Sequence, residues 1–213
     1  MSDYKNLGCI NEGGFSKIFL VEKNHYPFVK KVYKNKDKDL FLNEYKIFKI
    51  LDNDSNNIMK ILDVFNSDGI NEIYFDYLNN SLDKKIFNYK YGMDVLHQIS
   101  SGLEFIHNKN IIHFDLKTEN ILYSGKSVNT YGKKHIDYKI NIKISDFNIS
   151  FLTNTPKNIY MMNQPTIHII PPEYIFKIDC GKPCDIWSLG CCIFEIFTGN
   201  KLFSSDLTSE TTF

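Results

Sequence analysis

A short polar segment at residues 111–122 carries side chains that could do chemistry. It reads IIHFDLKTENIL and brings Asp115, Lys117 and Asn120 close together in the sequence, and a further carboxylate, Asp146, follows a strand-like run downstream. Carboxylate and amide oxygens are ligands that Mg²⁺ prefers, and a carboxylate can also accept a proton from a hydroxyl group. An isolated Asp or Asn is a turn or helix-cap residue about as often as it is a catalytic or metal-binding one. The spacing of these residues must therefore decide between the two roles.

Four motifs stand in a fixed order along the chain. Residues 113–120 keep the spacing H-x-D-L-x-x-x-N of a kinase catalytic loop, and Asp146 and Phe147 in ISDFNIS stand where the motif D-F-G begins. Upstream, INEGGFSKIFLV is similar to a glycine-rich phosphate loop, FVKKVY offers a strand lysine, and Glu44 follows. Because four motifs in this order rarely arise by chance, the chain resembles a eukaryotic protein kinase domain over nearly its whole length.

The resemblance implies an ATP-dependent transfer of a phosphoryl group to a protein hydroxyl, a reaction that asks the protein mainly to position groups and neutralise charge. Asp115 would accept the proton of that hydroxyl, and Lys117 would reach the transferring group. Asn120 and Asp146 would hold the Mg²⁺ ions that bridge the phosphate oxygens. Members of the family that act on Ser or Thr carry a lysine at the position of Lys117, so we expect a protein serine/threonine kinase with a Ser/Thr protein substrate.

Two adjacent lysines compete for the ATP-binding role on the strand. Lys30 and Lys31 must point to opposite faces because successive strand residues alternate, so only one can meet ATP. The residue two positions earlier shares the face of each lysine, which puts Phe28 beside Lys30 and Val29 beside Lys31. A Phe would fill the volume that adenine needs. The pattern therefore favours Lys31 with Glu44 as its ion-pair partner, and leaves Lys30 as the alternative.

The expected nucleotide site departs from the family pattern in its glycine-rich loop. Asn11 and Ser16 stand where the first and third glycines would be, and only Gly13 matches, so the backbone is less free to approach phosphates. Further on, the resemblance makes Phe75 the gatekeeper and residues 76–78 the hinge. The residues expected to contact the nucleotide are Gly13, Gly14, Ser16, Ile18, Val29, Lys31, Phe75, Asp76, Leu78 and Leu122.

The later part of the chain narrows the resemblance. QPTIHIIPPEYI and CGKPCDIWSLGCCIFEIFTGNKLF are similar to the end of the activation segment and the central helix of a kinase. Asp185 and Trp187 match its buried anchors, Glu173 matches the acidic residue of A-P-E, and Thr166 would lie against the catalytic carboxylate. The chain also has Phe114 in place of the arginine before the catalytic Asp, and an insertion before DFN. With the two segments above, these features most resemble the LAMMER or CDC-like group of the CMGC kinases. The SR-protein kinases are the nearest alternative.

Hydrophobic periodicity supplies the elements that must position these residues. Strands are expected at Lys17–Glu22, Phe28–Tyr33 and Ile73–Tyr77, and helices at Leu40–Leu51, Asp94–His107 and Asp185–Phe197. With the resemblance, this predicts an α+β, bilobal protein-kinase fold. The N-lobe and hinge, residues 1–78, would hold a small, mostly antiparallel β-sheet and one helix. A partial, mainly helical C-lobe would occupy residues 79–203, with a surface insertion at 124–138 between two short strands and a tail at 204–213.

The end of the sequence differs from the family, because only KLFSSDLTSETTF follows the last expected helix. We therefore expect a C-lobe that lacks its last helices. Glu173 would lack its usual arginine, and Ile193, Phe194 and Phe197 would be partly exposed as an apolar patch that invites a partner. A truncated pseudokinase or scaffold that binds a partner through this incomplete C-lobe is the alternative function. A small-molecule kinase of the same fold fits less well, because the D-x-W helix belongs to the protein-kinase substrate platform.

Composition excludes several classes of function. The 213 residues carry 25 Lys+Arg and 25 Asp+Glu and so have no net charge, which gives no reason to expect binding to nucleic acid or a membrane surface. No stretch approaches the roughly 18 apolar residues of a membrane span. Five cysteines without a CxxC pair favour reduced thiols over a disulfide framework or zinc site. A cytoplasmic or nuclear protein is therefore expected.

Overall fold

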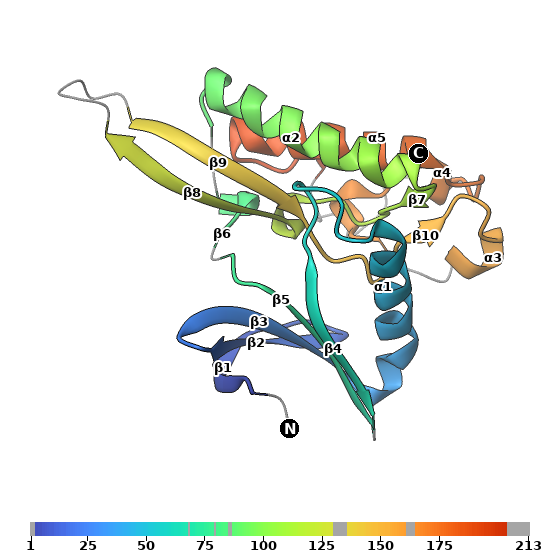
Figure 1. Cartoon of the computed structure of the whole chain (residues 1–213). Helices are drawn as coiled ribbons and strands as arrows, with labels where there is room; N and C mark the ends of the chain where they lie inside the picture. Colours follow the sequence, from blue (N-terminus) through green and yellow to red (C-terminus); the bar gives the residue numbers. More distant parts are fainter. Residues whose placement is uncertain are drawn as a thin grey trace.

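The chain forms a β-sheet with one long helix beside it, followed by a mainly helical part, as Figure 1 shows. The computed structural model describes residues 3–67, 69–78, 80–84, 87–129, 136–160 and 165–203. The first part contains β1 (Lys5–Glu12), β2 (Ser16–Lys23), β3 (Tyr26–Tyr33), a 3₁₀ turn (Asn35–Asp37), α1 (Lys38–Leu51), β4 (Ile61–Ser67) and β5 (Ile70–Asp76). The second part contains β6 (Asn80–Ser81), α2 (Tyr89–Asn108), β7 (Ile111–Ile112), β8 (Ile121–Asn129), β9 (Ile136–Ile144), β10 (Phe151–Leu152), α3 (Lys157–Tyr160), α4 (Pro172–Ile175) and α5 (Lys182–Thr198), with 3₁₀ turns at Leu82–Lys84, Thr118–Asn120 and Ile167–Ile169.

The five strands of the first part form one antiparallel sheet in the order β1-β2-β3-β5-β4. The turn between β2 and β3 consists of Asn24 and His25, whose φ angles are 52° and 66°. A two-residue hairpin turn with positive φ at both positions matches the natural twist of the strands. Gly69, with φ of 81°, lies in the turn between β4 and β5. Short turns therefore join β2 to β3 and β4 to β5, whereas β3 and β5 pair across a connection that contains α1 and β4.

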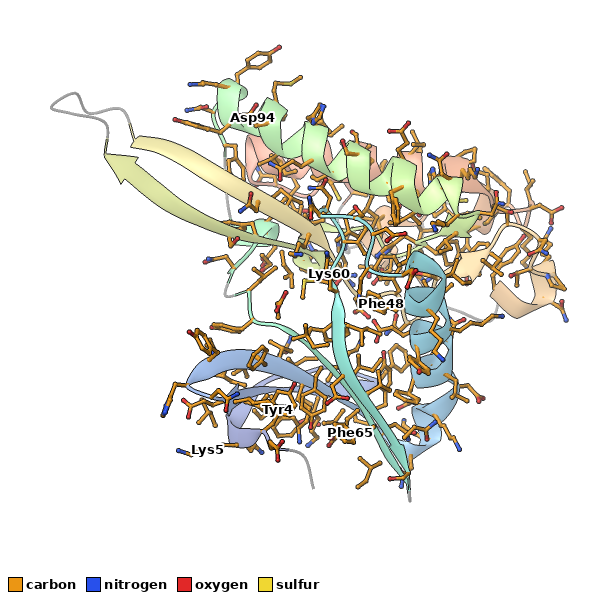
Figure 2. The ribbon with its side chains drawn as sticks, in the orientation of Figure 1. Tyr4, Lys5, Phe48, Lys60, Phe65 and Asp94 are labelled. Carbon is orange, nitrogen blue, oxygen red and sulfur yellow. The ribbon has the colours of Figure 1, made fainter. Side chains whose placement is uncertain are left out.

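Helix α1 packs its apolar face against the sheet. Phe41, Ile47, Phe48 and Leu51 are buried on it and recur at the spacing of one helical face. Figure 2 shows Phe48 on the side of α1 that faces the middle of the molecule, where its ring contacts Phe75 of β5 at 5.5 Å between centroids. The helix is thereby fixed at the junction of the two parts.

The other face of the sheet carries a smaller aromatic group. The ring of Tyr74 on β5 lies 4.3 Å from that of Tyr4 and 5.5 Å from that of Phe65, measured between centroids; Tyr4 and Phe65 are labelled in Figure 2. Tyr74 alternates with Phe75, so the two side chains point to opposite faces of the sheet. Both faces of β5 are therefore covered.

Helices α2 and α5 lie side by side in the second part (Figure 1). Helix α2 begins where the side chain of Asn88 accepts a hydrogen bond from the Tyr91 backbone N–H at 3.1 Å, a typical N-cap. Gly92 allows close approach, because a Cβ there would lie 2.3 Å from Cε1 of Phe197 on α5. Helix α5 ends at Gly199, whose φ of 72° suits a glycine C-cap.

The observed elements confirm the expected fold class, an α+β kinase-like fold with an antiparallel sheet and one helix in its first part. The expected helices are each extended by one to five residues at their ends, and Tyr77 lies just beyond the strand in which it was expected. Strands β1 and β4 were not predicted. The division into lobes at residue 78 stays a prediction, and the tail at 204–213 lies outside the described residues.

The region expected as a surface insertion is largely a β-hairpin. Strands β8 and β9 are nine residues each and pair from Ile121↔Ile144 to Asn129↔Ile136. The two strands are therefore long rather than short, and residues 130–135 between them lie outside the described part. Alternating apolar residues in IDYKINIKI have the period of a strand, so the strand expected before Asp146 begins earlier than the polar residues around it indicated.

Candidate active site

A cleft of about 390 Å³ opens between the sheet and the second part of the chain. Its walls come from β1, β2, β3 and β5 on one side, and from β8 and the segments that precede β8 and follow β9 on the other. All of the expected nucleotide contacts except Gly14 line it, together with Glu44, Asn120 and Asp146. The full set is Ile10, Asn11, Gly13, Ser16, Ile18, Val29, Lys31, Glu44, Met59, Phe75, Asp76, Leu78, Asn80, Ser81, Glu119, Asn120, Leu122, Ser145 and Asp146.

Lys31 joins the two sides of this cleft. Its Nζ lies 3.0 Å from Oε1 and 2.9 Å from Oε2 of Glu44 on α1, and 2.7 Å from Oδ1 of Asp146. The backbone N–H of Phe147 donates to Glu44 Oε1 at 2.9 Å. Glu44 is fully buried and Lys31 is 5% exposed, so the two charges are paired where water could not compensate an unpaired one.

Lys30 points to the opposite face of β3, away from the cleft. Its Nζ lies 3.2 Å from Oε1 of Glu72 on the neighbouring strand β5 and 5.3 Å from the centre of the Phe19 ring. The alternation of the strand thus separates the two lysines, as expected. Of the pair, Lys31 lines the cleft and Lys30 does not.

The charges of Lys31 and Asp146 support each other. Burial by itself opposes the charge on Lys31, but attraction to Asp146 and Glu44 outweighs it and raises the lysine's pKa well above its usual value. Burial likewise opposes the charge on Asp146, and the neighbouring Lys31 reverses this effect and lowers the pKa of the carboxyl group. Both groups are therefore charged at neutral pH.

The segment from His113 to Asn120 gathers polar side chains around Asp115. Asp115 Oδ2 lies 2.8 Å from Lys117 Nζ and accepts from Asn120 Nδ2 at 3.1 Å. Its Oδ1 accepts from the hydroxyl of Thr166 at 2.7 Å and from that residue's backbone N–H at 3.2 Å. Lys117 Nζ also donates to the Thr166 hydroxyl at 2.7 Å. The expected contact between Thr166 and the catalytic-loop residues is thus present.

Asp185 at the start of α5 fixes the backbone of this segment through hydrogen bonds to its carboxylate. Its carboxylate accepts from the backbone N–H groups of His113 at 2.9 Å and Phe114 at 2.8 Å, and lies 2.9 Å from Nε2 of His107. Phe114 has a φ of 68°, which is strained for a bulky residue. The fully buried carboxylate therefore stabilises a backbone turn that the sequence would not adopt alone.

The loop between β1 and β2 is closed by its own backbone and by a lysine. The N–H of Gly13 donates to the Ser16 carbonyl at 2.9 Å, and Lys34 Nζ donates to the carbonyls of Gly13 at 3.2 Å and Gly14 at 2.9 Å. Gly13 and Ser16 line the cleft, whereas Gly14 does not. Lys34 was not singled out in the sequence, because nothing in its spacing connects it with this loop.

Comparison with known proteins identifies the family of this arrangement. The protein kinase domain family matches residues 4–212. The chain belongs to this family. It is 32% identical to calcium-dependent protein kinase 6 of Plasmodium berghei over 99% of its own length and 14% of that protein. It is 27% identical to human cyclin-dependent kinase-like 2, over 97% of the chain and 42% of that protein.

Further relatives support the same family and the fold. The chain is 27% identical to the serine/threonine-protein kinase Doa of Drosophila melanogaster, over 95% of the chain and 26% of Doa. The kinase PK-1 of Cydia pomonella granulovirus has the same fold, with a TM-score of 0.79, 22% identity, and coverage of 98% of this chain and 76% of PK-1. The chain spans less than half the length of these curated relatives. It is homologous to serine/threonine kinases.

Several residues of this kinase domain's cleft were not anticipated. Ile10 and Met59 add apolar surface where the expected adenine contacts lie, and Glu119 and Ser145 add polar groups near Asn120. The backbone N–H of Met59 donates a hydrogen bond to the Ile144 carbonyl at 2.9 Å, which positions Met59 in the cleft. Such residues belong to no motif, so only the folded chain reveals them.

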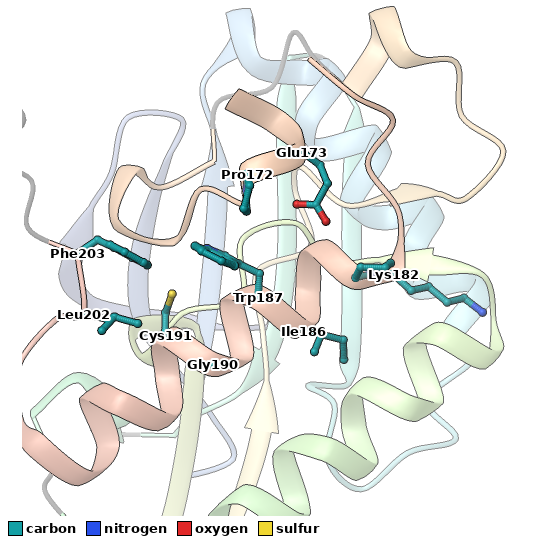
Figure 3. A pocket seen from close by; sticks show the side chains of 10 residues that line it. Pro172, Glu173, Lys182, Ile186, Trp187, Gly190, Cys191, Leu202 and Phe203 are labelled. Atoms are coloured by element: carbon teal, nitrogen blue, oxygen red, sulfur yellow. The ribbon is translucent and has the colours of Figure 1, made fainter. Parts of the chain in front are cut away.

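A second, more open cavity of about 770 Å³ lies on α5, away from the charged groups of the cleft (Figure 3). The rings of Trp187 and Phe203 stack above the helix at 5.5 Å between centroids. Oε2 of Glu173 is buried there without a hydrogen-bond partner among the described residues. Phe194 is 37% exposed nearby on α5. We place the chemistry in the smaller cleft, because the larger cavity lacks converging polar groups.

Two absences hold within the described residues. No helix there combines the length and apolar character needed to cross a membrane. No group of three or more His, Cys, Asp or Glu side chains is arranged there to hold a metal ion by itself.

Proposed function

We propose that this kinase domain is an active protein serine/threonine kinase that transfers the γ-phosphoryl group of ATP to a Ser or Thr hydroxyl of a protein. One observation carries the proposal. Lys31, paired with both Glu44 and Asp146, and Asn120 line a single cleft, and Asn120 also contacts Asp115. Phosphoryl transfer requires this combination of positioned charge and a proton acceptor.

Asp115 is proposed as the proton acceptor. Support comes from its contact with the Thr166 hydroxyl at 2.7 Å, which is the contact that a substrate hydroxyl would make. Lys117 bridges Asp115 and that hydroxyl, so its positive charge lies where a phosphoryl group would arrive. Lys31, held by Glu44, would contact the phosphates of the nucleotide.

Asn120 and Asp146 are proposed as the Mg²⁺ ligands. The Asn120 amide nitrogen donates to both the carbonyl and the carboxylate of Asp115, which orients its amide oxygen as the atom available to a cation. A carboxylate and an amide oxygen, supplemented by phosphate and water oxygens, suit the octahedral preference of Mg²⁺. The ion would supply charge neutralisation at the phosphates.

The adenine end of the cleft is proposed to be apolar. Val29, Phe75, Leu78 and Leu122 line that side, with Asp76 at the end of β5 next to them. Similarity to cyclin-dependent kinase-like 2 and to Doa agrees with placement in the CMGC group, most like the LAMMER or CDC-like kinases.

Transfer of radiolabel from [γ-³²P]ATP to a panel of Ser/Thr peptides tests the proposed activity. We expect Asp115→Asn to lower turnover by roughly 10²-fold or more, because the proton acceptor is lost. Lys31→Met should be similarly damaging, and Lys30→Met is the matched control that should stay within about twofold of the parent. Absence of transfer by the parent protein in Mg²⁺, or equal effects of the two lysine variants, would overturn the proposal.

A scaffold function is the second candidate, and it is favoured by Oε2 of Glu173, which finds no hydrogen-bond partner in the part of the chain that the structure describes. The cavity on α5 combines apolar walls with a buried carboxylate oxygen, so a partner segment would bring a Lys or Arg flanked by apolar residues. Trp187 is the chain's single tryptophan and would report such binding by fluorescence. An Arg-containing apolar peptide should change this signal in the parent and bind about tenfold more weakly to Glu173→Gln. Equal affinity for both proteins, or no signal, would count against this function.

A further inference from the structure

Tyr33 lies beside the Lys31–Glu44 pair, and no motif singled it out. It follows Lys31 by two residues on β3, so both side chains lie on the face of the sheet that α1 covers. Tyr33 is 3% exposed, and its hydroxyl donates to Oε2 of Glu44. Its ring centre lies 5.0 Å from Lys31 Nζ, within the range of a cation–π contact.

Glu44 depends on this hydroxyl because it carries a fully buried charge. Its Oε1 is contacted by Lys31 Nζ at 3.0 Å and by the Phe147 N–H at 2.9 Å. Its Oε2 is contacted by Lys31 Nζ at 2.9 Å and by the Tyr33 hydroxyl. Lys31 contacts Asp146 at the same time; if it moved off Glu44 toward a phosphate, the Tyr33 hydroxyl would be the donor left on Oε2 among the described residues. A buried carboxylate oxygen without a donor is costly.

We propose that Tyr33 is a positioning residue, whose hydroxyl and ring hold Glu44 and Lys31 in the orientation from which Lys31 reaches Asp146 and the nucleotide. This inference rests on the proposed kinase function for its effect on ATP, and on the observed contacts for its effect on Glu44. Phe41 of α1 packs edge-on against the Tyr33 ring at 5.8 Å between centroids. The same residue therefore joins β3 to α1 through both polar and apolar contacts.

Tyr33 remains a hydrogen-bond donor throughout the physiological pH range. Burial and the negative charge of Glu44 together raise the pKa of its hydroxyl well above the usual value, although Lys31 opposes them. A phenol held neutral in this way donates to Glu44 without adding a second negative charge to the site.

Tyr33→Phe, which removes a single oxygen, tests the role, and Tyr74→Phe is its matched control. Tyr74 is also fully buried in the sheet, and its hydroxyl donates to Oε2 of Glu72 at 2.8 Å. Glu72 pairs with Lys30, on the face away from the cleft. Both variants remove a buried tyrosine hydroxyl from a glutamate paired with a lysine, so both should lower the melting temperature by a similar amount.

Only Tyr33→Phe should affect the cleft. We expect it to weaken binding of a non-hydrolysable ATP analogue with Mg²⁺ by roughly tenfold, to raise the KM for ATP more than it lowers kcat, and to speed hydrogen exchange at the Phe147 amide. Tyr74→Phe should leave all three unchanged. If Tyr33→Phe matches Tyr74→Phe in all three measurements, Tyr33 is merely structural and the inference is wrong.

The measurements separate this inference from the proposed function. A parent that binds the nucleotide without transferring phosphate would refute the kinase activity. The nucleotide affinity and the hydrogen exchange of the Phe147 amide would still test the role of Tyr33. A parent that binds no nucleotide would refute both the kinase function and the proposed effect of Tyr33 on ATP.

Discussion

His168 lies next to the proposed catalytic residues in a small group of charged side chains. Lys201 Nζ is 2.9 Å from Oε1 of Glu119 and 3.1 Å from Nε2 of His168. Burial, and then the positive charge of Lys201, lower the pKa of His168. The imidazole is therefore neutral at pH 7 and can accept a hydrogen bond from Lys201.

The lowered pKa predicts a specific loss of stability in mild acid. The unfolded chain takes up a proton on His168 near pH 6.5, its ordinary pKa, whereas the folded chain resists it, so the free energy of unfolding falls as pH drops below about 6.5. Between pH 7.5 and 5.5 the melting temperature of His168→Asn should fall less than that of the parent. The exposed His25, changed to Asn, is the control and should behave like the parent. A parallel fall in all three proteins would contradict the prediction.

Phe114 shows what the sequence could and could not predict at this scale. Its identity indicated that the arginine usual before the catalytic Asp is missing. The aromatic neighbours of Phe114 were not predictable, because they lie far away in the sequence. They are Phe151, Tyr160 and Tyr174, whose rings lie 5.1, 6.3 and 5.7 Å from that of Phe114 between centroids. In the same way, spacing separated Lys31 from Lys30, but only the fold brought Tyr33 against Glu44.

Helix α1 is tied to the segment after Asp146 by a side chain that immediately precedes Glu44. The Asn43 amide donates to the carbonyls of Asn148 at 2.9 Å and Ser150 at 2.8 Å. Together with the hydrogen bond from the Phe147 N–H to Glu44, these contacts join α1 to residues 147–150. The position of Asp146 in the cleft therefore depends on α1.

Replacing this amide should loosen the segment without unfolding the domain. In Asn43→Ala two carbonyls lose their donor, which we expect to cost about 1–2 kcal/mol, to speed hydrogen exchange over residues 147–152, and to weaken Mg²⁺-dependent nucleotide binding several-fold. The exposed Lys46, three residues further along α1, is changed to Ala as the control. Unchanged exchange in Asn43→Ala would show that α1 and the segment are held together by other contacts.

Elements that bury one face were predicted more accurately from the sequence than elements that are exposed. Helices α1, α2 and α5 bury an apolar face and were found by their period of 3.6 residues. All eight residues of β1 are exposed, so this edge strand has no buried-and-exposed alternation for a sequence pattern to reveal. Strand β9 does alternate, and it was expected as a strand-like run before Asp146; its length was underestimated because Lys and Asn residues surround its isoleucines.

At the scale of the whole molecule, one apolar core runs through both parts. It contains Phe41, Phe48 and Phe75 from the first part, and Ile99, Ile106 and Ile196 from the second. Phe147 lies where the two parts meet. Its ring is 5.1 Å from that of Phe48 on α1 and 4.7 Å from that of His113 in the segment 113–120, measured between centroids. Because this core is shared, we expect the two parts to unfold together.

Phe147→Ala should weaken this coupling as well as the stability. Removing a fully buried Phe typically costs about 3–5 kcal/mol. In the parent, denaturant unfolding followed by Trp187 fluorescence on α5 should coincide with the loss of hydrogen-exchange protection in β3. In Phe147→Ala the two transitions should separate, with β3 losing protection first, because α1, which packs on the sheet, has lost the aromatic link through Phe147 to His113. Phe151→Ala is the control, since Phe151 is 5% exposed and belongs to the second apolar cluster, around Phe114. It should lower stability while keeping the transitions together, and separate transitions in the parent itself would contradict a shared core.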